Sequence, residues 1–201
     1  MFSPVGHDLE RGWPGRIDGD RVIQLAAQTL QSFFTGGGGA REHAEYPLDG
    51  VVLRAPVLHP PSVRVFDEDG DFRFANPAAI VGPDDVVHLP GGVDEIQPVL
   101  RRAVVIGADG AIGGHTLMND WFAPGLAGAK AHDFAVSLGP VVITDLDEDW
   151  DDLVAVAARN TRLLPGDVIA APGEAQEPVR AGDVVELSLP PFGALRNVVA
   201  S

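Results

Sequence analysis

The sequence predicts a mainly β protein with few short helices. Glycine (24 residues) and proline (17 residues) are spread along the whole chain of 201 residues, which favours many short strands and turns over long helices. Only two segments place apolar residues at helical spacing. With 45% hydrophobic and 21% charged residues, the chain has the composition of a globular protein with one hydrophobic core.

The first 55 residues predict a small N-terminal region made of an arm, a hairpin and a short helix. Residues 1–15 lack periodicity, so we expect an extended arm. Residues 16–25 predict a hairpin that turns at Asp18-Gly19, and residues 25–34 predict the helix. The four glycines at 36–39 fit a flexible linker. A phosphate-binding loop is the alternative, but no Lys-Ser or Lys-Thr opens a helix after them.

Residues 56–201 predict the larger, strand-rich region. Residues 53–57 and 63–66 predict two strands that a proline pair separates, and residues 86–89 predict another strand. The acidic run DEDGD at residues 67–71 predicts a solvated hairpin turn, because it lacks the closing glutamate of a calcium loop.

The strongest strand signal lies at Val99–Ile106, whose second half is apolar on both faces and therefore predicted to be buried. A further apolar strand is predicted at residues 141–144. The acidic run at residues 145–152 precedes a helical pattern, and carboxylates favour a helix N-terminus, so we expect a helix to begin there. A metal cluster on this run is the alternative, although consecutive carboxylates point in different directions.

The net charge of −15 opposes binding to nucleic acid and to anionic membranes, because both would repel the chain. The charge therefore favours a small molecule or another protein as the partner, and of these we predict a small-molecule substrate, with no nucleic acid and no membrane. The chain lacks both a run of 18 apolar residues and an N-terminal signal pattern, so we expect a cytoplasmic location. The absence of cysteine excludes disulfides, thiolate metal sites and cysteine nucleophiles.

Most of the polar residues that could bind a ligand or take part in catalysis lie between the two apolar strands of the central stretch. An amide, carboxylates, an ammonium group and an imidazole occur there within 15 residues, at Asn119, Asp120, Lys130, His132 and Asp133. Such groups each contribute a directional charge or hydrogen bond, so together they could hold a small anionic or enolisable ligand.

Three motifs of this stretch resemble the fumarylacetoacetate hydrolase family. They read AVVIG at residues 103–107, HTLMNDWFA at 115–123 and AKAHDFAVSLGP at 129–140. The resemblance implies a mixed β-sandwich or roll fold and a homodimer. Further matches follow in the order of the family at residues 18–25, 53–63, 74–90, 163–172 and 181–199.

The resemblance also implies a divalent metal that two glutamates and the aspartate of the Asn-Asp pair hold, and that chelates a β-dicarbonyl substrate. The two glutamate positions fall on Val99 and Arg101 in this sequence, so only Asp120 remains. The segment with the catalytic His and Glu of the family is also missing. One carboxylate beside a cationic side chain does not retain a magnesium-like ion, so we predict no metal and no other cofactor.

Two interpretations of Arg101 stay open. In the first, its guanidinium occupies the metal region, pairs with Asp120 and offers hydrogen-bond donors to a substrate oxyanion. In the second, Arg101 merely neutralises Asp120 in a pocket that no longer works.

The remaining site residues follow from their positions in the motifs. Lys130 aligns with a family lysine that stabilises negative charge on the substrate. His115 replaces a family tyrosine and is either a proton carrier or a core histidine. We predict catalytic roles for Lys130, Arg101, Asp120 and His115, and substrate binding by Asn119, Asp133 and Thr116.

These observations favour a metal-independent enzyme that acts on a small enolisable carbonyl compound. Isomerisation, cyclisation and decarboxylation are its expected reactions, because they need mainly oriented charge and exclusion of water. The first alternative is a catalytically silent binding or assembly subunit. The second is a metal-dependent hydrolase of the acylpyruvate type.

Overall fold

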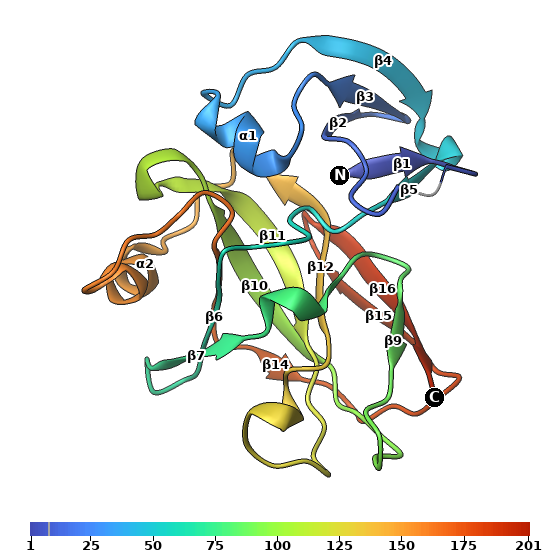
Figure 1. Ribbon diagram of the computed structural model, residues 1–201, viewed down its shortest axis with the longest axis vertical. Coiled ribbons are helices and arrows are strands. Elements are labelled where there is room, and N and C mark those ends of the chain that lie inside the picture. Colours follow the sequence, from blue (N-terminus) through green and yellow to red (C-terminus); the bar gives the residue numbers. More distant parts are fainter. Residues whose placement is uncertain (8) are drawn as a thin grey trace.

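A computed structural model describes residues 1–7 and 9–201 of the chain. It is mainly β, with two α-helices and four short 3-10 helices among the described residues, so the predicted fold class is confirmed. The N-terminal strands lie at one end of the molecule, and the long central strands run below them (Figure 1). The 3-10 helices are η1 (Leu48–Gly50), η2 (Pro77–Ala79), η3 (Ala108–Gly110) and η4 (Gly128–Ala131).

The N-terminal region contains two small sheets and one helix. Their elements are β1 (Phe2–Pro4) paired with β5 (Val51–Leu53), the sheet of β2 (Gly15–Asp18), β3 (Arg21–Leu25) and β4 (Glu42–Pro47), and helix α1 (Leu30–Thr35). The predicted hairpin is present, but Asp18 pairs with Arg21, so its turn is Gly19-Asp20 and not Asp18-Gly19 as predicted. Helix α1 begins later than predicted because Thr29 caps it, and the Thr29 hydroxyl accepts a hydrogen bond from the Ser32 amide at 3.0 Å.

The prediction of an extended arm at residues 1–15 is wrong for β1. Phe2 is 1% exposed and packs against the rings of Trp13 and Tyr46, with ring centroids 6.1 and 5.4 Å away. Burying one aromatic ring contributes about 2 kcal/mol, which offsets part of the entropy cost of ordering the first strand. Residue 8, which belongs to the same predicted arm, lies outside the described residues.

The main sheet carries the central strands. Its order is β7-β6-β13-β10-β11-β12-β8, and β14 pairs with β10. The central strand β10 has the predicted bounds, and it pairs antiparallel with β11 along almost its whole length. The strands are β6 (Val63–Phe66), β7 (Phe72–Ala75), β8 (Ile80–Val81), β10 (Val99–Ile106), β11 (Ile112–Asp120), β12 (Val136–Ile143), β13 (Val168–Ala170) and β14 (Glu174–Ala175).

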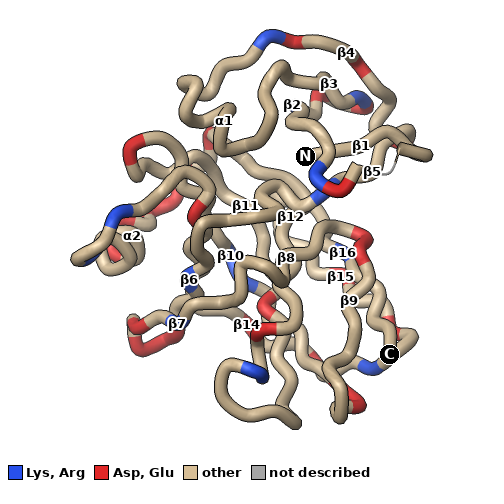
Figure 2. Tube along the Cα trace, viewed as in Figure 1, with Lys and Arg blue, Asp and Glu red and all other residues tan. Residues whose placement is uncertain are grey.

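Two further units cover this sheet. One is the three-stranded sheet of β9 (Val86–His88), β15 (Val184–Leu189) and β16 (Gly193–Ala200), with β16 in the middle. The other is α2 (Asp151–Ala158), whose first turn contains Asp151 and Asp152, as the acidic run predicts. The turn between β6 and β7 is also the predicted hairpin turn, and the acidic residues of this turn colour the end of the hairpin red (Figure 2).

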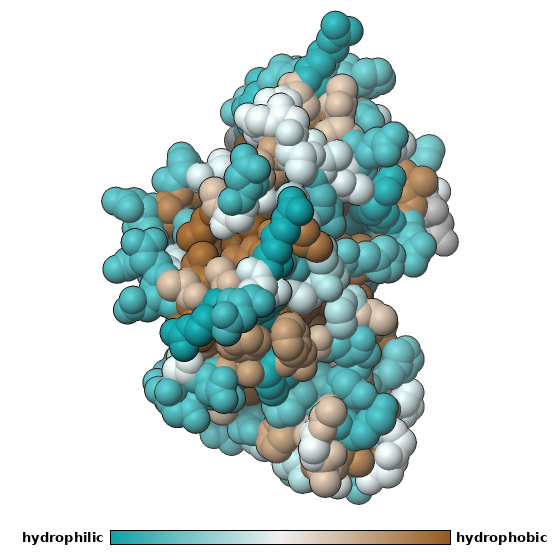
Figure 3. All heavy atoms as spheres, turned by 60° about the vertical axis from the view of Figure 1, so that its left-hand side comes forward, coloured by the Kyte–Doolittle hydropathy of each residue, from teal (hydrophilic) through white to brown (hydrophobic). Residues whose placement is uncertain are grey.

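The hydrophobic core is divided by the main sheet. On one side, the side chains of Ala103 and Met118 pack with strands β6 and β13. On the other side, Val104 and Ile106 pack with Trp150 and Ala157 of the α2 segment. Seen from the side of α2, the surface is mostly hydrophilic, with apolar areas between the polar groups (Figure 3). No helix among residues 1–7 and 9–201 is long and apolar enough to cross a membrane.

Candidate active site around Asp120

The segment that contains Asn119 and Asp120, which the sequence placed between two apolar strands, is itself a strand, β11. This matters because neighbouring residues of a strand point to opposite faces. Arg101 lies directly opposite Met118 in the ladder between β10 and β11, and Asp120 follows Met118 by two positions. Arg101 and Asp120 therefore share one face.

Asp120 is fully buried and is held by two arginines. Its carboxylate accepts a hydrogen bond from Arg101 Nε at 3.0 Å, and both of its oxygens contact Arg73 Nη2. Arg101 Nη1 also donates to the carbonyl oxygens of Phe66 at 2.8 Å and Ala171 at 3.1 Å. The predicted pairing of Arg101 with Asp120 is thus present, and two backbone carbonyls fix its direction.

Arg101 can lie along the sheet because residue 173 has no side chain. A Cβ atom on Gly173 would come within 2.7 Å of the Leu100 carbonyl oxygen and would also clash with the Arg101 side chain. Gly173 therefore leaves room for the aliphatic part of the Arg101 side chain.

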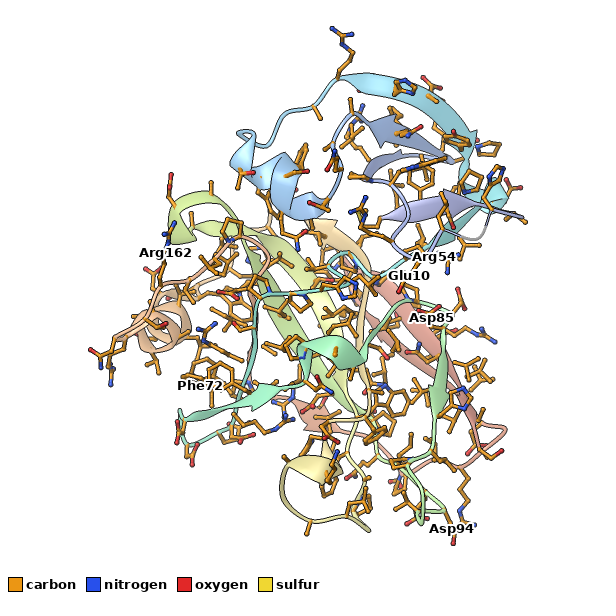
Figure 4. The ribbon with its side chains drawn as sticks, viewed as in Figure 1. Glu10, Arg54, Phe72, Asp85, Asp94 and Arg162 are labelled. Atoms are coloured by element: carbon orange, nitrogen blue, oxygen red, sulfur yellow. The ribbon has the colours of Figure 1, made fainter. Side chains whose placement is uncertain are left out.

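Arg73 is the main site residue that the sequence reasoning missed. It lies on β7, the edge strand that Phe72 begins (Figure 4), and it pairs with the core residue Val65. Ala75, on the same face of β7, is buried in the core cluster that contains Met118. Arg73 therefore points toward β11. The available signal was a cation within the apolar run FRFA, but 47 residues separate it from Asp120.

The charges around Asp120 hold it in the ionised form. Burial alone raises the pKa of its carboxyl group, but the positive charges of Arg73 and Arg101 and their hydrogen bonds to the carboxylate outweigh burial. The net effect is a pKa below the ordinary value of an aspartate. Two guanidinium groups face the Asp120 carboxylate, and a second carboxylate, that of Asp67 at the rim, lies 3.8 Å from Arg101 Nη2 and is 59% exposed.

His132 completes the cluster. Its ring stacks on Phe122 at a centroid distance of 4.9 Å and an angle of 29° between the planes. Its Nδ1 atom lies 3.0 Å from Arg73 Nη2 and 3.7 Å from the nearer oxygen of Asp120. The side chains of Arg73 and His132 are 26% and 25% exposed, so this edge of the cluster is accessible from solvent.

The structure does not bring His115 and Asn119 to this cluster. They lie opposite Val104 and Leu100 on β10, and therefore on the other face of β11. His115 is buried near Trp150, at a centroid distance of 6.2 Å, and neither ring nitrogen has a hydrogen-bond partner among the described residues. Asn119 accepts a hydrogen bond from the Val99 amide at 2.9 Å. Strand alternation is the physical reason for both placements.

The other three predicted residues have structural partners. Thr116 is on the Asp120 face, but its hydroxyl donates to the Val141 carbonyl at 2.7 Å. Lys130 is 77% exposed and pairs with Asp133 at 2.8 Å, a contact between neighbours in sequence. Lys130 and Asp133 therefore form an ion pair with each other. The side chains that contact the Asp120 carboxylate are instead those of Arg73 and Arg101.

The residues around Asp120 do not fit a divalent metal. Magnesium and manganese prefer several carboxylate or carbonyl oxygens. Here a single carboxylate faces two guanidinium groups, and Val99 and Arg101 stand where the resemblance places the other ligands. Among the residues that the structure describes, no three His, Asp or Glu side chains are grouped to hold a metal ion.

A separate cleft of about 530 Å³ lies between the N-terminal strands and the end of β12. Its lining is mostly apolar and includes Phe2, Phe33, Val142 and Phe192, and none of the predicted site residues contributes to it. The cleft is therefore separate from the cluster around Asp120.

Comparison with known proteins gives a consistent picture of the fold. No family model matches the chain. A protein from Methanocaldococcus jannaschii, described as uncharacterised, is 27% identical over an alignment of 166 residues, which covers 61% of this chain and 69% of that protein.

Solved structures match almost the whole chain. One is a 5-carboxymethyl-2-hydroxymuconate delta-isomerase from Mycobacterium smegmatis, with 25% identity, a TM-score of 0.76 and 94% of each chain covered. A maleylpyruvate hydrolase from Sphingobium sp. SYK-6 gives 22% identity and a TM-score of 0.78, with 94% of this chain and 96% of that chain covered. A 2-hydroxyhepta-2,4-diene-1,7-dioate isomerase from Mycobacterium marinum has 23% identity and a TM-score of 0.75, with 94% of this chain and 92% of that chain covered. The chain therefore has the fold of these enzymes.

Proposed function

Since the chain has a fumarylacetoacetate hydrolase-like fold, we propose that it is a metal-independent enzyme acting on a small enolisable carbonyl compound. Its substrate carries an anionic oxygen, and the reaction is an isomerisation, a cyclisation or a decarboxylation. These reactions share one need, which is stabilisation of an enolate or a related oxyanion.

The observation that carries this proposal is the pair of arginines on the buried Asp120 carboxylate. Arg73 and Arg101 supply two fixed positive charges, and the carboxylates that face them are the buried Asp120 and the exposed Asp67. Arg73 Nη1 is buried and has no hydrogen-bond partner among the described residues, so an oxyanion that enters beside the partly exposed Arg73 side chain would meet an unsatisfied donor. A buried guanidinium with a free donor stabilises an oxyanion strongly, because the surroundings screen it less than water does.

Arg101 is bound differently and has another role. Its Nε and Nη1 atoms are used by Asp120 and by two carbonyl oxygens, so it mainly adds positive charge and holds Asp120 in place. Asp120 in turn orients Arg73. The three residues form a preorganised site whose charge does not need to rearrange during the reaction.

Hydrolysis fits this arrangement less well than decarboxylation. Hydrolysis needs a base that activates water, and an Asp120 carboxylate with a lowered pKa and two arginine partners accepts a proton poorly. In decarboxylation of a β-keto acid, the carbon–carbon bond to the carboxylate breaks, its electron pair forms the enolate, carbon dioxide leaves, and water later returns a proton. That sequence needs no base at the site.

The similar proteins support the substrate class. The compounds in their descriptions are a hydroxymuconate, a heptadienedioate and a maleylpyruvate, and one solved structure is described as a complex with manganese(II) ion and pyruvate. All are keto or enol carboxylates. We extend this class to the present chain, with the two arginines in place of the cation.

The experiment is a turnover assay with acetoacetate and oxaloacetate on protein from which divalent metals have been removed. We expect turnover above the uncatalysed rate, unchanged by chelator. Arg73→Gln should lower kcat/KM about 100-fold, because it removes a charged oxyanion donor. Arg102→Gln is the matched control, since Arg102 lies on the opposite face of β10 and pairs with Glu148. Activity that appears only after Mg²⁺ or Mn²⁺ is added would refute the proposal.

One observation favours a second candidate, a catalytically silent binding subunit. The donors of Arg101 are satisfied within the protein, as they would be in a site that has become a structural ion-pair cluster. In that case neither keto acid is turned over, and Arg73→Gln changes stability but no measured activity. The turnover assay therefore separates the two candidates.

A further inference from the structure

We infer that His132 acts as a neutral imidazole that presents its Nε2–H group to the oxyanion of the ligand, and that Arg73 fixes this tautomer. This inference rests on the proposed function for its second half, the contact with a ligand. Its first half, the tautomer, concerns the protein alone. No bond forms or breaks at His132 in this role.

The position of the ring follows from its contacts. Stacking on Phe122 holds its plane, and Nδ1 faces inward to Arg73 and Asp120. Nε2 is on the other side of the imidazole, away from Arg73. Because a quarter of the side chain is exposed, a small molecule that enters the cluster can meet this outer edge.

The tautomer follows from the chemistry of the partner. A guanidinium group has only donors, so a nitrogen that forms a hydrogen bond with it must accept. Nδ1 of His132 lies 3.0 Å from Arg73 Nη2 and therefore carries a lone pair, which places the proton of the neutral ring on Nε2. Asp120 would favour the opposite tautomer, but its nearer oxygen is 3.7 Å from Nδ1, beyond hydrogen-bond distance.

Arg73 thereby reverses the role that a histidine beside an aspartate usually has. In a His-Asp pair, the aspartate accepts from Nδ1–H and leaves Nε2 free to take a proton as a base. Here Nε2 carries the hydrogen and can only donate. A neutral imidazole donor next to the Arg73 guanidinium group provides a further hydrogen bond to an enolate oxygen. Arg73 is the positioning residue for this donor.

The first measurement records the nitrogen and carbon-bound proton correlations of the imidazole rings by NMR at neutral pH, with His132 assigned from the spectrum of His132→Gln. We expect a protonated Nε2 and an unprotonated Nδ1. In Arg73→Met, His132 should shift toward the Nδ1–H tautomer because only Asp120 remains near Nδ1. Arg102→Met should leave the ring unchanged. A wild-type ring with a protonated Nδ1 overturns the inference.

The second measurement separates the donor role from packing. Glutamine can place an amide N–H near the position of Nε2, whereas phenylalanine keeps the stacking on Phe122 but has no donor. In the oxaloacetate assay we expect His132→Phe to lose about 100-fold in kcat/KM and His132→Gln to stay within about tenfold of wild type. Equal losses in both variants, or no loss in His132→Phe, overturn the donor role.

The two arms also distinguish this inference from the proposed function. If the wild-type protein turns over no keto acid, the proposed function fails, and pyruvate is then titrated into labelled protein as the probe. A change in the Nε2–H resonance of His132 on addition of pyruvate supports the donor role in binding, and no change in that resonance refutes it.

Discussion

At the scale of single residues, the central feature is a buried carboxylate whose charge is balanced by side chains from two other strands. Removing one member of such an ion pair leaves a buried charge without a partner, which costs more than the pair contributes. Asp120 is fully buried, and Arg101 is 7% exposed, so water cannot replace a lost partner.

We therefore expect Asp120→Asn to lower the free energy of unfolding by about 3 kcal/mol. The amide keeps the shape of the side chain but leaves Arg73 without a carboxylate partner and Arg101 with only the exposed Asp67. Chemical denaturation at pH 7 measures the change. Asp18→Asn is the control, because Asp18 forms only exposed ion pairs, and it should change stability by less than about 1 kcal/mol.

The same carboxylate predicts a dependence of stability on pH. The pKa of Asp120 is lower in the folded protein than in the unfolded chain, so the unfolded chain binds a proton first as the pH falls. The stabilisation by the ionised carboxylate is complete above the unfolded pKa of about 4 and is lost as the pH falls toward the lower folded pKa. The difference in stability between wild type and Asp120→Asn should therefore narrow below about pH 4. A constant difference across that range would contradict this assignment.

At the scale of elements, the two faces of β11 decide which predicted residues meet. The sequence predicted β10 with its observed bounds because apolar residues mark it clearly. The sequence of β11 gave no such signal, because its polar and apolar residues do not alternate. The structure shows the reason: both faces of this strand are buried along most of its length. Because the strand was not predicted, the sequence analysis could not assign Asp120 to one face and Asn119 and His115 to the other. Arg73 could not be predicted because its contact depends on how the β6–β7 hairpin packs against β11.

Because successive side chains of β11 point to opposite faces, His115→Leu tests whether His115 is structural and not part of the site around Asp120. His115 is 5% exposed, and both of its ring nitrogens lack hydrogen-bond partners among the described residues, so its polarity opposes folding. We expect leucine to raise the free energy of unfolding by about 1 kcal/mol and to leave turnover unchanged.

Thr116→Val, on the neighbouring position, should have the opposite effect on stability, because it removes the hydrogen bond to Val141. Denaturation curves of both variants measure this. A loss of turnover in His115→Leu would restore His115 to the site.

At the scale of the whole molecule, the order of the motifs along the chain predicted the fold, which the comparison with solved structures confirms. Backbone topology tolerates changes in site chemistry, and so the fold alone does not determine the reaction. The sequence did show that two metal-ligand positions of the resembled family hold Val99 and Arg101. The source of the second positive charge emerged only from the packing of β7.

The homodimer that the resemblance implies remains a proposal for the whole molecule. Light scattering coupled to size-exclusion chromatography should give twice the chain mass of 21.1 kDa. A mass of 21.1 kDa at all concentrations tested would refute the dimer and would leave the Asp120 site unaffected, because every contact described for that site lies within one chain.

The central claim is that Arg73 and Arg101 bind an anionic ligand in place of a divalent metal ion. Calorimetric titration of pyruvate into metal-stripped protein, with and without Mg²⁺, tests it most directly. We predict the same Kd in both conditions and a loss of binding in Arg73→Gln. Binding that requires Mg²⁺, with Arg73→Gln equal to wild type, would contradict the claim.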